Sequence, residues 1–128
     1  MKVLLDTHAL LWFLLHDRRL GRDAAAIVMD LHNDVLVSPA SYWEIAIKVG
    51  LGKYTLKEEF ATFMEREIKS NLLTILPITV RHAAAVATMP LHHRDPFDRL
   101  LAAQATVEQI PILSADTALD KYGVTRIW

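Results

Sequence analysis

Cysteine is absent from this sequence of 128 residues, and its absence excludes several classes of protein at once. A chain without cysteine has no disulfide framework, no thiol nucleophile, no thiolate-bound zinc and no iron–sulfur cluster. Glycine and proline are also scarce, with 4 and 5 residues. No repeat, low-complexity tract or linker interrupts the chain. We therefore expect a single domain spanning residues 1–128.

Long apolar runs are missing as well. The longest stretch free of charged and histidine side chains, residues 70–80, has 11 residues, far fewer than a membrane span needs. The first five residues resemble the start of a signal peptide, but Asp6 and His8 interrupt them and no small-residue cleavage site follows. We expect a cytoplasmic protein with no membrane partner.

The chain also lacks an excess of charge of either sign. Its 14 lysine and arginine residues and 15 acidic residues give a formal net charge of −1. This balance excludes a generic basic nucleic-acid binder that works by bulk charge, although a local basic patch stays open. Hydrophobic residues make up 52% of the chain. Intrinsic disorder is therefore excluded, because so apolar a chain buries enough surface to offset its ordering entropy.

Short apolar runs alternate with longer helical patterns along the chain. Strands are predicted at residues 3–5, 35–37, 72–76, 112–113 and 124–127. Helices are predicted at residues 9–15, 23–31, 41–49, 56–68, 80–88 and 96–108. Strands that alternate with helices and lack a polar face indicate a parallel sheet covered on both sides. The predicted fold class is α/β, a three-layer α/β/α sandwich with a central parallel sheet of four to five strands.

Four acidic residues fall where this architecture gathers its ligands. Asp6 directly follows the first strand, and Glu44 lies in the first turn of the helix after the second. Asp98 lies in the first turn of the helix before the fourth strand, and Asp116 just past that strand. The carboxyl ends of parallel strands and the helix N-termini share one edge of such a sheet. We therefore expect the four carboxylates to converge there.

Converging carboxylates repel one another unless a cation neutralises them. Oxygen ligands without cysteine or a clear histidine set favour Mg²⁺ or Mn²⁺. Such an ion binds a phosphodiester oxygen and lowers the pKa of a water molecule, and helix N-termini at the same edge favour a phosphate. The arrangement predicts metal-assisted phosphodiester hydrolysis, with Asp6, Glu44, Asp98 and Asp116 as metal ligands and catalytic residues.

Each acid also has a structural interpretation. Asp98 stands at the capping-box position of the helix that Asp95 caps. Glu44 stands four residues before Lys48, the favoured spacing for a surface ion pair. Asp116 is a candidate N-cap for a short segment through residue 119. Asp6 is the hardest to explain in this way, because an acid at the end of a buried strand is costly without a partner.

Four segments resemble the PIN-domain family, and most closely the VapC-type toxins of toxin–antitoxin systems. They are Val3–His8 (VLLDTH), Ser41–Ile45 (SYWEI), Asp95–Ala105 (DPFDRLLAAQA) and Ser114–Asp116 (SAD). The resemblance covers essentially the whole chain, and its most specific part is the segment that begins at Asp95.

The resemblance implies a PIN-like nuclease: a Mg²⁺- or Mn²⁺-dependent endoribonuclease that is the toxin of a type II module, silenced by a co-expressed antitoxin. By motif, Asp6, Glu44 and Asp98 match the acidic core of the family, and Asp116 is its more variable fourth acid. Ser114 fits the Ser or Thr that often lies near that acid. Ala115 stands where many relatives carry Asn, which leaves direct ligation by Asp116 open.

Other side chains are candidates for contact with RNA. They are Thr7, Ser114, Arg99 and His93. A zinc site at His92 and His93 is disfavoured, because adjacent histidines in a loop do not easily point at one metal. The alternative is that this loop is merely solvated.

Two other functions stay open. One is a catalytically silent PIN-like binding module. The other, less favoured, is a phosphoacceptor signalling domain, which needs adjacent acids after the first strand, whereas Thr7 follows Asp6. A haloacid-type phosphatase needs Asp-x-Asp, and His8 stands in place of the second acid.

The chain also carries more hydrophobic residues than a small core needs. Helices 10–15 and 56–68 are expected to leave apolar surface uncovered. A homodimer and an antitoxin segment that folds on binding would cover this surface.

Overall fold

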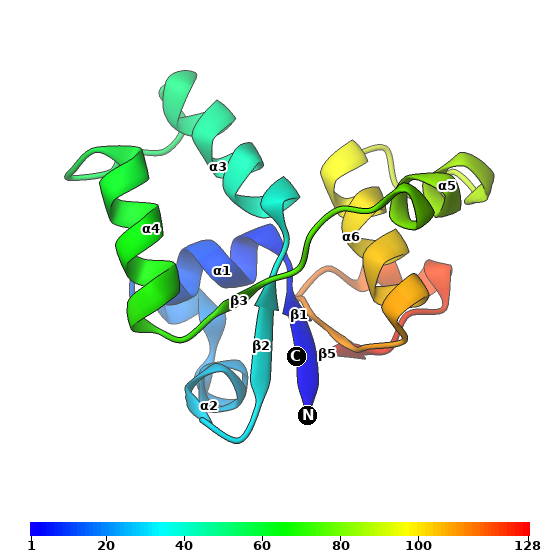
Figure 1. Cartoon of the computed structure of the whole chain (residues 1–128), viewed down its shortest axis with the longest axis horizontal. Helices are drawn as coiled ribbons and strands as arrows, with labels where there is room; N and C mark the ends of the chain where they lie inside the picture. The colour runs from blue at the N-terminus through cyan, green and yellow to red at the C-terminus, as the bar shows by residue number, and fades with distance from the viewer.

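A parallel sheet of five strands runs through the centre of the molecule, in the order β3-β2-β1-β4-β5 (Figure 1). The computed structural model describes residues 1–128. The strands are β1 (Lys2–Leu5), β2 (Asp34–Val37), β3 (Thr74–Ile75), β4 (Ile112–Leu113) and β5 (Arg126–Ile127). Every pair of neighbours is parallel. The predicted α/β class is therefore confirmed, with five strands.

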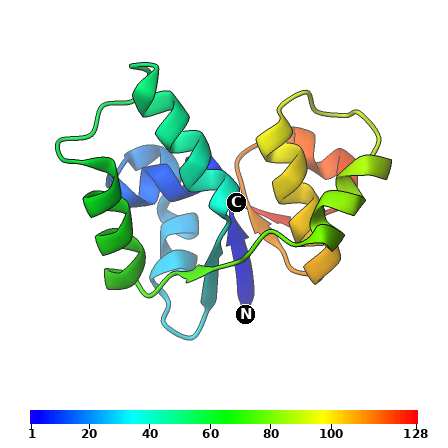
Figure 2. The ribbon, with the colours of Figure 1, turned by 45° about the horizontal axis from the view of Figure 1, so that its top comes forward.

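Helices cover both faces of this sheet. They are α1 (Thr7–Leu14), α2 (Arg22–Met29), α3 (Pro39–Gly50), α4 (Phe60–Ser70), α5 (Val80–Thr88) and α6 (Pro96–Glu108). Two short 3-10 segments are η1 (Arg18–Leu20) and η2 (Thr117–Tyr122). Figure 2 shows α1 to α4 on one side of the sheet and α5 and α6 on the other. The three-layer arrangement is as predicted.

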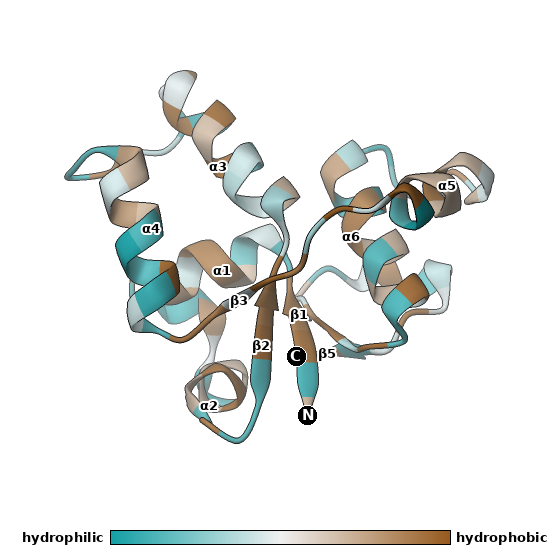
Figure 3. Cartoon of the chain, in the orientation of Figure 1, coloured by the Kyte–Doolittle hydropathy of each residue, from teal (hydrophilic) through white to brown (hydrophobic).

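Side chains from the central strand enter two separate cores. Val3 and Leu5 of β1 belong to a cluster that includes Ile45 of α3 and Phe63 of α4. Leu4, which points to the opposite face, belongs to a second cluster built on α6 and η2. Figure 3 shows the hydrophobic residues concentrated in β1 and β2. A strand buried on both faces needs no polar alternation, which is why the sequence shows a continuous apolar run there.

Three helices start two or more residues from the predicted position, and local contacts explain two of these differences. α1 begins at Thr7, because Asp6 caps it and accepts a hydrogen bond from the backbone of Ala9. α3 begins at Pro39, with the hydroxyl of Ser38 accepting from the backbone of Ala40. Proline suits the first helical position because its missing N–H has no helical partner there. Glu44 is therefore in the second turn of its helix and not in the first.

The third boundary is the start of α4, at Phe60 rather than at residue 56. Leu56 packs against the first core from the preceding loop, so its burial does not require the helix to begin there. No helix of the structure combines the length and the apolar character of a membrane span.

The chain reverses its direction of travel across the sheet between β1 and β4. From β1 it passes to β2 and β3 on one side, and it then returns to β4 and β5 on the other. In open parallel sheets, ligands bind at the carboxyl ends of the strands that flank such a reversal. Asp6 follows β1 and Ser114 follows β4 at this point.

Candidate active site

A hydrogen bond between Asp6 and Ser114 connects the ends of β1 and β4 at the reversal point. The residues just before them, Leu5 and Leu113, are register partners. Ser114 Oγ donates a hydrogen bond to Asp6 Oδ2, and the backbone N–H of Ala9 donates to Oδ1 at 2.7 Å. Burial raises the pKa of the Asp6 carboxyl above its usual value, while these two hydrogen bonds act in the opposite direction. Both Asp6 oxygens are thus held in fixed positions.

Asp116 is connected to this pair through Ser114. The backbone N–H of Asp116 donates to Ser114 Oγ at 3.0 Å. Asp116 Oδ1 accepts from the backbone of Ala118 at 3.0 Å and caps η2, so the N-cap interpretation is confirmed. Partial burial raises the pKa of Asp116, but hydrogen bonds from His93 and Ala118 outweigh it and hold the pKa below its usual value. Oδ2 is the Asp116 oxygen that is not used in the cap.

Asp98 lies in the first turn of α6, but its carboxylate takes no part in the helix cap. Asp95 is the N-cap, and its Oδ1 accepts from the backbone N–H groups of Phe97 at 2.8 Å and Asp98 at 3.4 Å. In a capping box the side chain of Asp98 would accept from the backbone N–H of Asp95. That N–H donates instead to His93 Nδ1 at 3.1 Å. The capping-box interpretation of Asp98 is therefore wrong.

The pKa of Asp98 is raised to about 7. The largest cause is burial, followed by repulsion from Asp95, and Asp6 and Glu44 add further repulsion. His93 acts in the opposite direction without cancelling these effects. Asp95, Asp6 and Glu44 thus all lie close enough to Asp98 to raise its pKa. An anionic Asp98 is costly here, and a nearby positive charge would stabilise it.

Glu44 of α3 brings a second uncompensated group to the same edge. Its side chain is only 5% exposed. Oε2 accepts from Lys48 Nζ at 2.8 Å, whereas Oε1 is buried without any hydrogen-bond partner. The predicted Glu44–Lys48 pair therefore exists, although it is not a solvated surface pair. A buried oxygen without a partner costs free energy unless a ligand satisfies it.

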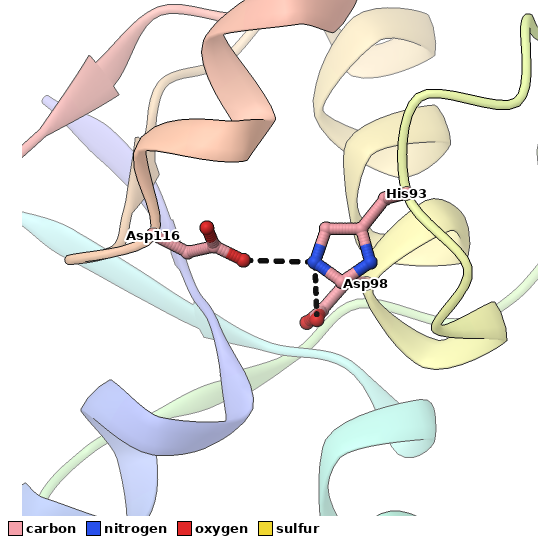
Figure 4. Close-up of side chains that lie close together, drawn as sticks. All are labelled: His93, Asp98 and Asp116. Carbon is pink, nitrogen blue, oxygen red and sulfur yellow. Dashed lines mark hydrogen bonds and ion pairs between the residues drawn. The ribbon is translucent and has the colours of Figure 1, made fainter.

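His93 lies between two of the acids (Figure 4). Its Nε2 is 2.9 Å from Asp116 Oδ2 and 3.3 Å from Asp98 Oδ2. One ligand atom from each of these three residues lies within 4.8 Å of the other two. His92 turns elsewhere and meets the ring of Tyr122 edge-on, with 5.2 Å between centroids. As predicted, the adjacent histidines do not point at one site.

The other two candidates for RNA contact, Thr7 and Arg99, are committed to internal contacts. Thr7 is buried, and its hydroxyl donates to Ser41 Oγ at 3.2 Å, which ties α1 to α3. Arg99 Nη2 donates to the carbonyl of Met89 at 3.2 Å. Arg99 thereby holds the loop that carries His93 against α6.

The available donor atoms fit a hard divalent cation. Glu44 Oε1 has no partner, Asp98 has only the contact with His93, and Asp116 keeps Oδ2 free of its cap. Carboxylate oxygens without thiolates suit Mg²⁺ or Mn²⁺.

Sequence reasoning missed the position of His93 between the acids. It also missed Tyr122, whose hydroxyl accepts a hydrogen bond from the backbone N–H of His93.

The fold and the side chains together define an α/β protein with an acidic cluster at the reversal point of its sheet. The family model described as PIN domain matches residues 3–124. The chain therefore belongs to the PIN domain family, and the resemblance noted from its four segments is confirmed.

Particular relatives share this family or this fold. Ribonuclease VapC16 of Mycobacterium tuberculosis is 39% identical over 69 residues, which cover 51% of this chain and 48% of that protein. The match thus spans about half the length of this curated relative. The crystal structure of VapBC2 from Rickettsia felis, bound to a promoter DNA fragment, covers 100% of this chain and 99% of its own, with 14% identity and a TM-score of 0.72. FitAcB from Neisseria gonorrhoeae covers 98% and 96%, with 21% identity and a TM-score of 0.69. The two structures support the fold.

Proposed function

We propose that the protein is a divalent-metal-dependent endoribonuclease and the toxin component of a toxin–antitoxin pair. The observation that carries this proposal is a pair of acids at the sheet edge that the fold leaves incompletely satisfied. Asp98 has a pKa of about 7, and Glu44 Oε1 is buried without a partner. Membership of the PIN domain family and the ribonuclease name of a relative favour RNA as the substrate.

The four acids would divide the work according to their surroundings. Glu44 Oε1 has no partner in the fold, and Asp98 and Asp116 Oδ2 contact only His93. Asp6 contributes the remaining lone pairs of a carboxylate held in place by Ser114. A divalent cation held by these oxygens would polarise the scissile phosphodiester and activate the attacking water. The N-terminus of α6 lies at the same edge and favours an anionic phosphate. Thr7 and Arg99 would act by positioning α3 and the His93 loop.

An apolar groove between α3 and α4 is the proposed antitoxin site. Two adjoining hollows of about 360 and 430 Å³ share Tyr42 and Phe60. Met64 and Ile68 of α4 line one of them, and the exposed Trp43 lines the other. The crystal structures of VapBC2 and of VapBC-1 from Haemophilus influenzae have the same fold. An amphipathic antitoxin segment would fit this groove by placing its apolar face against it.

A second copy of the chain is the other proposed partner. The expectation that residues 10–15 supply much of the apolar surface is wrong for Leu10, Leu11 and Leu14, which lie in the core. Leu15 is exposed as expected, and further exposed apolar side chains lie at Met29 and Leu31 of the α2 region. Sedimentation of the free protein at micromolar concentration should show a dimer, and a monomer would contradict this part of the proposal.

RNA cleavage tests the central proposal. Purified protein should cut structured RNA with Mn²⁺ or Mg²⁺ and stop when chelator is in excess, with Asp98→Asn as the inactive control. Cleavage that persists in chelator would contradict the metal mechanism. RNA binding without cleavage under all metal conditions would instead favour the catalytically silent binding module.

A further inference from the structure

The imidazole of His93 stands where a cation shared by Asp98 and Asp116 would bind. Its Nε2 lies 2.9 Å from Asp116 Oδ2 and 3.3 Å from Asp98 Oδ2 (Figure 4). The contact with Asp116 is a hydrogen bond, and the contact with Asp98 is an ion-pair distance. The ring therefore occupies the space between the acids, and its chemical role follows from the position of its proton.

The other ring nitrogen, Nδ1, determines which nitrogen carries the proton. His93 Nδ1 accepts a hydrogen bond from the backbone N–H of Asp95 at 3.1 Å. A nitrogen that accepts carries no proton, so the proton of the neutral ring is on Nε2. Nε2 then donates to Asp116 and has no lone pair for a metal. In metal sites the arrangement is reversed, because a histidine that ligates through Nε2 donates from its other nitrogen.

The contact also uses the oxygens that a cation would need. Asp116 Oδ1 already accepts from Ala118, so His93 engages the one oxygen that Asp116 has left. The contact with His93 is also the one polar side-chain contact that the structure gives Asp98. A cation bound through Asp116 Oδ2 and Asp98 Oδ2 would therefore take the place that His93 Nε2 now has between these two oxygens.

The loop holds His93 in this position from several directions. The backbone N–H of His93 donates to the hydroxyl of Tyr122 at 2.7 Å. Arg99 fixes the start of the loop through the carbonyl of Met89. No helix or strand is formed between α5 and α6, so the side chain can leave the acids without disturbing the sheet.

We propose that His93 is a built-in occupant of the cation position, which holds Asp98 and Asp116 together in the metal-free protein and must withdraw before both acids bind one ion. The inference rests on the proposed function for the existence of a cation site. His93 is thus a positioning residue that lowers the affinity of the metal-free protein for divalent cations. If the cation binds only to protein in which His93 has withdrawn, the apparent affinity is the intrinsic affinity multiplied by the fraction of protein in that form.

Calorimetric titration with Mn²⁺ tests this proposal without relying on activity. We expect His93→Ala to bind Mn²⁺ at least about fivefold more tightly than the unchanged protein. His93→Gln, whose amide N–H can still donate to the acids, should lie between the two. His92→Ala is the matched control on the same loop, and its affinity should stay within about twofold of the unchanged protein. The metal-free His93→Ala protein should also unfold at a lower temperature.

The possible outcomes separate this inference from the proposed function. Weaker Mn²⁺ binding by His93→Ala would make His93 a metal ligand and overturn the inference, while leaving the metal site intact. Equal affinity would overturn it as well. If neither the unchanged protein nor any variant binds Mn²⁺, the metal site itself is wrong and both proposals fail. Long-range ¹⁵N–¹H NMR adds a direct readout, because it should show the Nε2-protonated ring of His93 in the metal-free protein.

Discussion

The two halves of the acid cluster differ in how far the fold satisfies them. In the half built on β1 and β4, Asp6 has both oxygens hydrogen-bonded, to Ser114 and to the backbone of Ala9. In the half built on α3 and α6, Glu44 leaves one buried oxygen without a partner, and Asp98 meets only His93. The strand half is complete in the metal-free protein, and the helix half is not.

This difference separates two tasks that the acids perform. Neutral hydroxyl and backbone donors can fix a carboxylate in place without removing its charge. Asp6 and Ser114 therefore supply geometry. Asp98 supplies a charge that is costly at this site, and Glu44 supplies a buried oxygen without a partner. A bound cation would lower both costs. Changes on the helix side should affect metal binding and catalysis most, and changes on the strand side should affect stability.

The largest effect is expected for Asp98→Asn. The substitution keeps the size of the side chain and removes the charge that the proposed cation needs. RNA cleavage should fall by about 10³-fold or more, which corresponds to about 4 kcal/mol of transition-state stabilisation. Circular dichroism and thermal unfolding should show a folded protein. Cleavage close to that of the unchanged protein would remove Asp98 from the site.

The next effect is a pH dependence of stability that belongs to Asp98. Its pKa of about 7 in the folded state lies above the value of 3.8 expected when unfolded. The folded state therefore binds the proton more tightly, and this contribution to stability decreases as pH rises toward and through 7. In chelator, the free energy of unfolding of the unchanged protein relative to Asp98→Asn should fall by about 2 to 3 kcal/mol between pH 5 and pH 8. Denaturant titrations at both pH values measure it, and parallel behaviour of the two proteins would contradict the raised pKa.

On the strand side, Ser114→Ala should cost about 1 to 3 kcal/mol of stability, because it leaves a buried carboxylate oxygen of Asp6 without its donor. The loss should appear in denaturant unfolding of the metal-free protein. Ser38→Ala serves as a matched control, since Ser38 is equally buried and caps α3 through the backbone of Ala40 without a hydrogen bond to any acid. It should lower stability by about 1 kcal/mol without changing metal affinity. If Ser114→Ala left the free energy of unfolding unchanged, the hydrogen bond from Ser114 would not be what holds Asp6 in place.

The smallest effect is expected for Asp95→Asn. Asparagine caps a helix about as well as aspartate does, so stability should change by no more than about 0.5 kcal/mol. Because the charge of Asp95 raises the pKa of Asp98, cleavage should change by no more than a few fold. If Asp95→Asn were more damaging to cleavage than Asp98→Asn, the roles assigned to the two residues would be reversed.

The sequence predicts those parts of the site that depend on local pattern and on the rule for parallel sheets. Asp6 follows an apolar strand, Asp95 and Pro96 mark a helix start, and the topology brings the acids to one edge. The roles of Asp95 and Asp98 cannot be separated in this way, because both lie at capping positions. They are separated by His93 Nδ1, which takes the backbone N–H of Asp95.

Contacts between distant segments set the limit of such prediction. The position of His93 depends on Tyr122, 29 residues away, and on the path of a loop without regular structure. The burial of α1 shows the same limit. Its apolar residues predict an exposed surface or a core equally well, and only the packing of α1 against α3 and the sheet decides between them.

Crystals grown with Mn²⁺ would test the central claim most directly, through the anomalous scattering of the ion. The account predicts an anomalous peak within about 2.5 Å of carboxylate oxygens of Asp98 and at least one of Glu44 and Asp116, with the imidazole of His93 displaced from between the acids. No peak at saturating Mn²⁺, with the imidazole of His93 still between Asp98 and Asp116, would contradict it.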